Sequence, residues 1–221
     1  MVSKISFQKN KSKVWKRILI TIAVIIALFI TLILATILRS EQVGDWYYKQ
    51  NKFEKSATFY EMSYTIYHNF NSLDKLCLSL ILQNDYEGQT KYLPKLLKNG
   101  EDSFSNKNEY YNHLADYIIS LYNVGRISDY KNEYSRSIDK LVNHIQSVLP
   151  LGPLSYDPNA KNEDLIWAIE LSDKLILGTD NLLLKSSIYS VQSDLYLRLG
   201  NSEKAKELSD LAEEIKKNYF K

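Results

Sequence analysis

The stretch GDWYYKQNKFEKSATFYEMS, residues 44–63, decides the fold class of this chain. Aromatic and small residues recur at helical spacing on both sides of Lys52, and Gly44, Ser56 and Ser63 are small where the neighbouring positions are bulky. This spacing predicts two helices, over residues 41–51 and 53–69. Because few residues separate the two helices, we expect them to pair as a hairpin.

Helical periodicity continues outward from this stretch through most of residues 41–219. Glycine (7) and proline (4) are scarce, which disfavours a sheet-rich fold with many tight turns. The chain is therefore predicted to be all-α. Further helices are expected at residues 72–83, 86–98, 106–124, 127–147, 162–177, 181–199 and 202–219.

Local signals mark where these helices begin and end. Gly125 and Gly200 suit left-handed C-terminal caps, whereas Ser72, Asp180 and Ser202 are expected to cap helix N-termini. Pro94 falls inside a predicted helix and is expected to kink or restart it. Residues 150–161 hold three of the four prolines and are expected to form an ordered loop or an internal joint.

The opening stretch resembles a tetratricopeptide repeat, a helical hairpin in which small residues sit where the paired helices touch. The residues that match the pattern there are Gly44, Tyr47, Phe53, Ser56, Tyr60 and Ser63. A second match near the C-terminus uses Tyr196, Gly200, Ala205 and Ala212, although Ser193 and Ser209 depart from the pattern. Between the two matches the likeness is loose, and Tyr130 is far too large for the usual alanine. The resemblance implies an α-solenoid of antiparallel helical hairpins.

The same resemblance implies a groove that binds a peptide or a partner segment. In this family the first helix of each hairpin lines a concave surface, and mixed polar and aromatic side chains suit recognition of an extended peptide. The positions expected to face the groove are Glu41, Asp45, Tyr48, Lys49, Asn112, Tyr122, Asn123, Asp194 and Arg198.

An apolar segment precedes the hairpins. Residues 18–38 contain no charge, proline or glycine, and as a helix they would span about 30 Å, the thickness of a bilayer core. We expect a retained transmembrane helix, and a cleaved signal peptide is the competing interpretation. The apolar run is longer than a typical signal core, and residues 35–38 make a poor cleavage site.

Charge is distributed unevenly about this segment. Residues 1–38 carry six basic residues and no acid, so residues 39–221 must carry −4 to give the total of +2. The positive-inside rule places residues 1–17 in the cytoplasm as a basic tail and residues 39–221 outside as the helical domain. The composition favours a bacterial cell membrane, and a mildly acidic domain does not suit nucleic acid.

Small residues recur at every fourth position of the apolar segment, at Ala23, Ala27, Thr31 and Ala35. Such a stripe lets two membrane helices approach closely, so a homodimer is one interpretation. The other is that alanine and threonine are simply common in membrane helices.

The sequence predicts neither a cofactor nor a metal site. His68, His113 and His144 have no ligand partners at a suitable spacing, and no phosphate-binding loop or nucleophile elbow is present. The single cysteine, Cys77, is expected to be buried and inert rather than reactive. An enzyme with an unrecognised site remains one hypothesis, but the chain is predicted not to be an enzyme.

These features together predict a function class. The favoured hypothesis is a single-pass, extracytoplasmic protein–protein interaction module that scaffolds or holds a partner. The alternative is a peptide or small-ligand sensor subunit, which would act through a second membrane protein because the cytoplasmic tail has only 17 residues.

Overall fold

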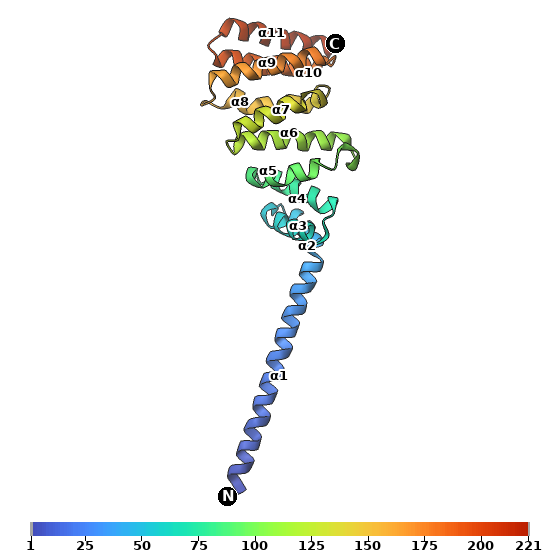
Figure 1. The fold of residues 1–221 in the computed structure, drawn as a ribbon, viewed down its shortest axis with the longest axis vertical. Coiled ribbons are helices and arrows are strands. Elements are labelled where there is room, and N and C mark those ends of the chain that lie inside the picture. The colour runs from blue at the N-terminus through green and yellow to red at the C-terminus, as the bar shows by residue number, and fades with distance from the viewer. Residues whose placement is uncertain (1, 221) are drawn as a thin grey trace. The chain divides into compact units, whose positions relative to one another are not determined.

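The structure is a computed structural model that describes residues 2–220, and the side chains of residues 15–220. Within residues 2–220 it contains eleven α-helices, three short 3₁₀ helices and no strand, so the predicted all-α class is confirmed (Figure 1). The chain divides into two compact units, Met1–Ser79 and Leu80–Lys221, which are described separately. Four of the six basic residues of the predicted tail, Lys4, Lys9, Lys11 and Lys13, have side chains outside the described set.

The first unit begins with one long helix, α1 (Val2–Leu38) (Figure 1). Its portion Trp15–Leu38 is long and apolar enough, by length and composition, to cross a membrane. The side chains of residues 15–35 are all exposed, as expected of a segment that does not belong to a protein core.

The next helix, α2 (Ser40–Tyr48), does not continue α1. No proline or glycine separates Leu38 from Val43, yet α1 ends at Leu38. Arg39 leaves helical geometry at φ −108° and ψ 22°. The Leu38 carbonyl instead accepts a hydrogen bond from the Tyr67 hydroxyl at 3.1 Å, and Ser40 is fully buried. Tertiary packing, which local sequence does not show, ends the helix there.

Helices α2 and α3 (Phe53–Tyr67) form the first hairpin. Tyr60 is 1% exposed and lies against Gly44, where an added Cβ would come within 2.7 Å of the tyrosine ring. Tyr47 stacks on Phe59 with ring centroids 5.5 Å apart. Glycine at position 44 therefore sets how closely the two helices approach.

Two buried hydroxyl pairs join α3 to α4 (Phe70–Leu82) inside the first unit. Ser56 and Ser79 are 2.9 Å apart between their oxygens, and Ser63 and Ser72 are 2.8 Å apart. Small hydroxyl side chains at both helices allow close packing and also satisfy each other's hydrogen bonds.

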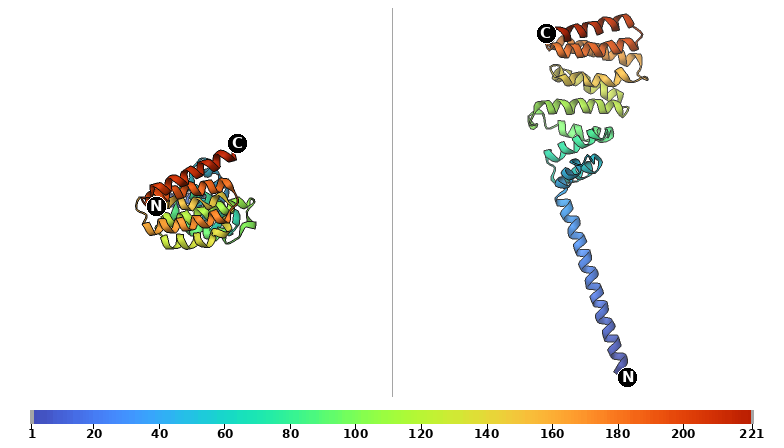
Figure 2. Two further views of the ribbon diagram at one scale, coloured as in Figure 1. Left: turned by 90° about the horizontal axis from the view of Figure 1, so that it is seen from above. Right: turned by 180° about the vertical axis from the view of Figure 1, so that it is seen from behind.

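The second unit is built from antiparallel pairs of helices. It contains α5 (Tyr86–Leu97), α6 (Lys107–Asn123), α7 (Ile127–Leu141), α8 (Gly152–Tyr156), α9 (Asn162–Gly178), α10 (Leu182–Arg198) and α11 (Ser202–Tyr219). Helices α10 and α11 lie side by side in both views (Figures 1 and 2). Short α8 contacts α6 and α10, while α7 contacts α9. The unit thus has a layer of first helices (α6, α8, α10) and a layer of second helices (α7, α9, α11).

The proline-rich segment is largely helical rather than a loop. It includes the 3₁₀ turn Leu149–Leu151 and then α8, which takes the place of a full-length first helix. The predicted helix over residues 127–147 is too long, because α7 ends at Leu141 and a separate 3₁₀ turn, Ile145–Ser147, follows. The tyrosines of α7 hold this segment, since Tyr130 and Tyr134 donate their hydroxyls to the carbonyls of Pro150 and Ser147.

The helix ends follow the predicted chemistry only in part. Gly125 and Gly200 have φ of 78° and 79°, which confirms them as left-handed caps. The predicted N-terminal caps at Ser72, Asp180 and Ser202 are wrong. The capping oxygens belong to nearby asparagines, which accept hydrogen bonds from backbone N–H groups in the first turn: Asn69, Asn181 and Asn201.

Pro94 does not restart its helix. Helix α5 runs through it to Leu97, and the Lys98 N–H still donates to the Pro94 carbonyl at 3.2 Å. The proline lacks only the N–H that would otherwise bond to the carbonyl of Thr90.

Candidate functional site

Two of the predicted groove residues in the first unit are engaged in an internal polar cluster. The Lys75 ammonium of α4 lies 2.9 Å from carboxylate oxygens of both Glu41 and Asp45 on α2. The Tyr60 hydroxyl donates to Asp45 at 2.8 Å, and the Ser72 hydroxyl donates to Glu41 at 3.1 Å. These carboxylates therefore join α2 to α3 and α4.

The pKa shifts in this cluster follow from its hydrogen bonds. Burial works against ionisation of Asp45, but hydrogen bonds from Lys75 and Tyr60 outweigh it, so the pKa of Asp45 lies below its usual value. Burial likewise opposes the charge on Lys75, yet hydrogen bonds to Glu41 and Asp45 raise its pKa. Both groups are ionised at neutral pH and act as a structural clamp.

The other two predicted groove positions of the first unit are more open. Tyr48 packs its edge against Phe53 with ring centroids 5.5 Å apart and is half-buried. Lys49 is exposed. Of the four positions, Lys49 is thus the one whose side chain is most open to solvent.

In the second unit, Tyr122 and Arg198 come together from different helices at α8. The Tyr122 hydroxyl donates to the Asp157 carboxylate just after α8. The Arg198 guanidinium donates to the Leu154 carbonyl at 2.6 Å. The hydrogen bond from Tyr122, another from the Asn159 N–H and the charge of Arg198 hold the pKa of Asp157 below its usual value. These two predicted residues hold α8 in place.

The three remaining positions are less constrained. Asn112 accepts a hydrogen bond from Gln146 at 2.7 Å, and Asn123 donates to the Ile119 carbonyl of its own helix at 2.9 Å. Both are exposed, and Asp194 on α10 is half-exposed. Asp116 is half-buried on α6, and burial raises its pKa above the usual value while nearby His113 opposes the shift.

The C-terminal repeat-packing positions lie where α10 and α11 meet. Ala205 and Ala212 are buried, and their carbonyls accept hydrogen bonds from the hydroxyls of Ser193 and Ser186 at 2.7 and 2.8 Å. The backbone carbonyl of Tyr196 accepts a hydrogen bond from the Asn201 N–H at 2.9 Å, next to the helix cap at Gly200. Serine at position 193 replaces the usual glycine and uses its small hydroxyl to bond across the pair.

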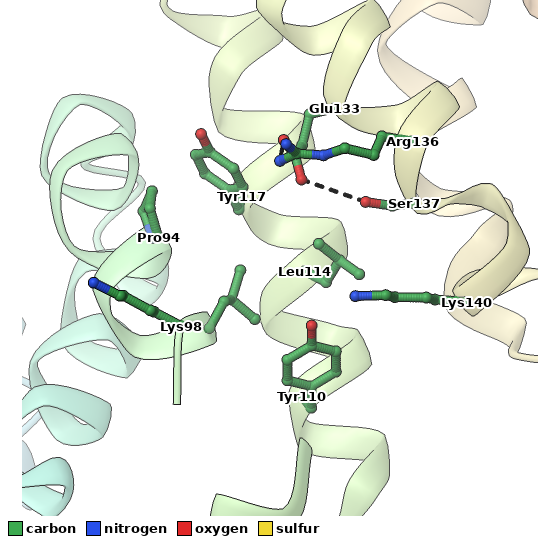
Figure 3. A pocket seen from close by; sticks show the side chains of 10 residues that line it. Pro94, Lys98, Tyr110, Leu114, Tyr117, Glu133, Arg136, Ser137 and Lys140 are labelled. Carbon is green, nitrogen blue, oxygen red and sulfur yellow. Dashed lines mark hydrogen bonds and ion pairs between the residues drawn. The ribbon is translucent and has the colours of Figure 1, made fainter. Parts of the chain in front are cut away.

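A cavity of about 310 Å³ opens in the second unit where α5 and α7 both flank α6 (Figure 3). Pro94 and Leu97 of α5 and Leu114 of α6 provide its apolar surface. This volume is at the lower end of the range for binding pockets. It is large enough for one or two side chains of another protein.

Polar and charged groups surround that apolar surface. The lining includes Tyr110 and Tyr117 of α6, Lys98 just after α5, and Arg136 and Lys140 of α7. Figure 3 shows Tyr110, Leu114 and Lys140 lying around the same space. The one acid of the lining, Glu133, is ion-paired with Arg136 and also accepts a weak hydrogen bond from Ser137 at 3.4 Å.

The cavity continues into a shallower hollow of about 200 Å³ along α6 and α7. The two share Tyr117, Glu133 and Arg136, and the hollow adds the ion pair between Arg126 and Asp129, 2.7 Å apart. Together they make an elongated depression that ends in the deeper cavity.

None of the nine predicted groove residues lines this depression. Tyr110, Leu114 and Tyr117 follow one another at three- to four-residue spacing, whereas exposed Asn112 and Asn123 fall on the opposite face of α6. The sequence analysis missed Tyr110, Leu114 and Tyr117 because it took the binding face of α6 from the family pattern. A visible signal was the recurrence of charged residues along one side of residues 127–141.

No group of three or more His, Cys, Asp or Glu side chains that could hold a metal ion occurs among the described residues. Cys77 is buried, and burial raises the pKa of its thiol, which disfavours the reactive thiolate.

Comparisons with known proteins concern mainly the fold. No model of a known protein family matches the sequence, and no curated protein does. Among solved structures, the chain is similar to YrrB, described as "a TPR protein with an unusual peptide-binding site". The TM-score is 0.52 and the identity 15%, over 82% of this chain and 87% of that one.

Two further structures show weaker similarity. One is MamA MSR-1 C2, with a TM-score of 0.49 and 12% identity over 83% of this chain and 98% of that one. The other is the TPR2AB-domain:pHSP90 complex of yeast Sti1, with a TM-score of 0.34 and 12% identity over 83% of this chain and 79% of that one. The similarity to YrrB shows that the helices of this chain adopt a tetratricopeptide-like fold of helical hairpins.

Proposed function

We propose that this chain is a membrane-tethered, extracytoplasmic protein–protein interaction module without catalytic activity. In this proposal residues 1–17 are a cytoplasmic basic tail, residues 18–38 are the transmembrane helix, and residues 39–221 bind a partner outside the membrane. The module scaffolds or holds that partner near other membrane proteins, and tethering raises its effective local concentration.

The observation that carries the proposal is the depression along α5, α6 and α7. It combines an apolar surface at Leu97 and Leu114 with hydroxyl and cationic groups, the mixture typical of a site that recognises side chains. Its open, elongated form suits a segment of another protein. The likeness of the fold to YrrB, a TPR protein described as having an unusual peptide-binding site, agrees with this kind of partner.

The tether rests on α1. Its uncharged portion, residues 18–38, would span about 30 Å as a helix, enough to cross a hydrocarbon core. The basic residues precede this portion, and Glu41 and Asp45 follow it, so the positive-inside rule favours an outward-facing domain.

We propose the absence of catalysis because carboxylates and the thiol that could react are ion-paired or buried. The carboxylates of Glu41, Asp45 and Glu133 are ion-paired, and Cys77 is buried. A general base or nucleophile has to reach a substrate, and these groups serve the packing of the helices instead.

The test is crosslinking on intact cells with a membrane-impermeant, lysine-reactive reagent, followed by mass spectrometry. Labelling of lysines beyond residue 39, together with one dominant crosslinked neighbour, would support both the topology and the interaction role. Lysines that react only after lysis would count against the extracytoplasmic placement, and protease treatment of spheroplasts would then separate a cytoplasmic domain from a covered one.

Homodimerisation through Ala23, Ala27, Thr31 and Ala35 stays a prediction attached to this proposal. The Thr31 hydroxyl donates a hydrogen bond to the Ala27 carbonyl at 2.9 Å within the same helix. A partner helix would therefore meet small side chains, and the Thr31 hydroxyl would already have its hydrogen bond. Replacing Ala27 and Thr31 by leucine is expected to abolish energy transfer between labelled copies in membranes. Unchanged transfer would exclude this interface.

A further inference from the structure

We propose that the cavity between α5 and α7 binds an acidic segment of a partner protein, with one carboxylate held by Lys140 and Tyr110, a second acidic group facing Lys98, and an apolar side chain between them seated on Leu97 and Leu114. This inference rests on the proposed function and adds the chemistry of the partner. It also places the binding site on the face of α6 opposite Asn112 and Asn123.

The charge balance of the cavity favours an anion. Lys98, Arg136 and Lys140 face one acid, Glu133, and Arg136 is already paired with that acid. Within the described residues, neither Lys98 nor Lys140 has an ion-pair partner. Lys98, just after α5, and Lys140 of α7 lie on opposite sides of the cavity (Figure 3), so each can meet a different acidic group of one bound segment.

The tyrosines supply hydrogen-bond donors in the same place. Tyr110 is 8% exposed, and its ring packs against Phe104 and Tyr111 with centroids 5.7 and 5.4 Å away. In the described part of the chain its hydroxyl has no hydrogen-bond partner, and nor has that of Tyr117. A tyrosine hydroxyl that lines a cavity and has no protein partner can donate a hydrogen bond to a ligand oxygen.

The shape and the single acid restrict the ligand. A small anion alone would leave the apolar surface of Pro94, Leu97 and Leu114 exposed to water. An apolar side chain next to the carboxylate would cover this surface. Glu133 would repel a second negative charge placed beside Arg136. The expected sequence is therefore a segment with separated acidic residues and an interspersed apolar residue, and not a highly charged phosphate.

The test measures fluorescence anisotropy with the full-length chain in non-ionic detergent micelles. The probe is a fluorescein-labelled peptide of glutamate–alanine repeats with one central leucine, and the matched peptide carries glutamine at every glutamate. We expect saturable binding of the acidic peptide that weakens as salt rises, and weaker binding of the glutamine peptide by about tenfold or more.

Two sets of variants locate the site. Lys98→Glu with Lys140→Glu is expected to weaken binding of the acidic peptide by at least about tenfold. The control, Lys174→Glu with Lys206→Glu, makes the same change in net charge at exposed positions of α9 and α11 and should leave affinity within about twofold. Tyr110→Phe keeps the ring contacts and should weaken binding by about three- to tenfold through the lost hydroxyl.

Each contrary result has a definite meaning. Equal loss in the control and cavity variants would show attraction by net charge alone and overturn the site. Inorganic phosphate that displaces the peptide at matched ionic strength, with sodium chloride as comparison, would make this a small-anion site instead. If cells show a dominant crosslinked partner whose capture survives Lys98→Glu with Lys140→Glu, the acidic-segment proposal fails while the interaction function stands.

Discussion

Single residues set the spacing between helices in this chain. Gly44 permits the ring of Tyr60 to lie directly on α2, and from there the Tyr60 hydroxyl reaches Asp45 at 2.8 Å. The same carboxylate binds Lys75, so one glycine allows the whole clamp between α2, α3 and α4 to form. A methyl group at position 44 would therefore disturb more than one contact.

Gly44→Ala tests this arrangement. The new Cβ would lie 2.7 Å from the buried tyrosine ring, so the helices must separate, and we expect the free energy of unfolding to fall by about 1–3 kcal/mol. Urea denaturation followed by far-UV circular dichroism would measure the change. Gly152→Ala is the control, because nothing lies within 4 Å of its added Cβ, and it should change stability by less than about 0.5 kcal/mol. Equal effects at the two positions would contradict the packing argument.

His144 makes stability depend on pH. Its ring stacks on Tyr111 with centroids 3.6 Å apart, and burial lowers its pKa below the usual value of 6.5, although the charge of Glu101 opposes the shift. The unfolded chain therefore binds the proton more readily than the folded chain does. The stability from this group is present above about pH 6.5 and is lost as pH falls through the lower, folded-state pKa.

We expect His144→Phe to keep the stacking and remove this part of the pH dependence. The check is the free energy of unfolding of both proteins at about pH 7 and about pH 5, inside the range where an ordinary histidine titrates. The wild type should lose more stability than the variant between these two values. Identical losses would mean that His144 does not change its protonation on unfolding in this range.

At the scale of elements, α8 is the part of the fold that depends most on its neighbours. It is only five residues long, yet Leu151 before it and Leu154 within it are completely buried. Tyr130 and Tyr134 of α7 donate to carbonyls of the preceding turns, and Arg198 of α10 donates to Leu154. So short a helix would not form in isolation, because the free-energy cost of helix nucleation exceeds the stabilisation from a few backbone hydrogen bonds.

Tyr130→Phe is expected to loosen this element. It leaves the buried Pro150 carbonyl without its donor, 2.6 Å away in the wild type, and should cost about 1–3 kcal/mol. Hydrogen exchange of residues 145–157 should speed up in the variant. Tyr156→Phe is the matched control, since Tyr156 is 79% exposed and should change neither stability nor exchange. Unaltered exchange after Tyr130→Phe would mean that apolar burial alone holds α8.

At the scale of the whole molecule, the chain has two helical units, and the first of them begins with a helix whose apolar portion is exposed. Leu28 and Leu32, near the middle of the apolar portion of α1, are 66% and 64% exposed. Such a row of exposed side chains is stable in lipid and would promote aggregation in water. The proposed membrane tether therefore rests on this one helix.

Leu28→Arg with Leu32→Arg tests that requirement. Arginine near the centre of a membrane helix costs about 2.5–3.5 kcal/mol per residue on insertion scales, so the variant should insert poorly. Alkaline carbonate extraction of cell membranes should leave the wild type in the pellet and release the variant or show its degradation. Leu28→Ile with Leu32→Ile should behave as the wild type. A wild-type chain released by carbonate would contradict the anchor.

The sequence alone determined the properties that depend on local periodicity and on length. It was sufficient for the all-α class, for most helix positions to within a few residues, for the helix of spanning length and for the glycine caps at Gly125 and Gly200. These follow from spacing, backbone geometry and apolar run length, which act within one or two turns of the chain.

Tertiary structure decided whatever depends on contacts between distant residues. The end of α1 at Leu38 depends on Tyr67, and the helical proline-rich segment depends on Tyr130, Tyr134 and Arg198. The cavity between α5 and α7 exists because both helices pack beside α6 while leaving part of its face uncovered. A row of charged residues marks one side of α7 in the sequence, but which part of α6 stays open is set by how the neighbouring helices share the buried apolar surface.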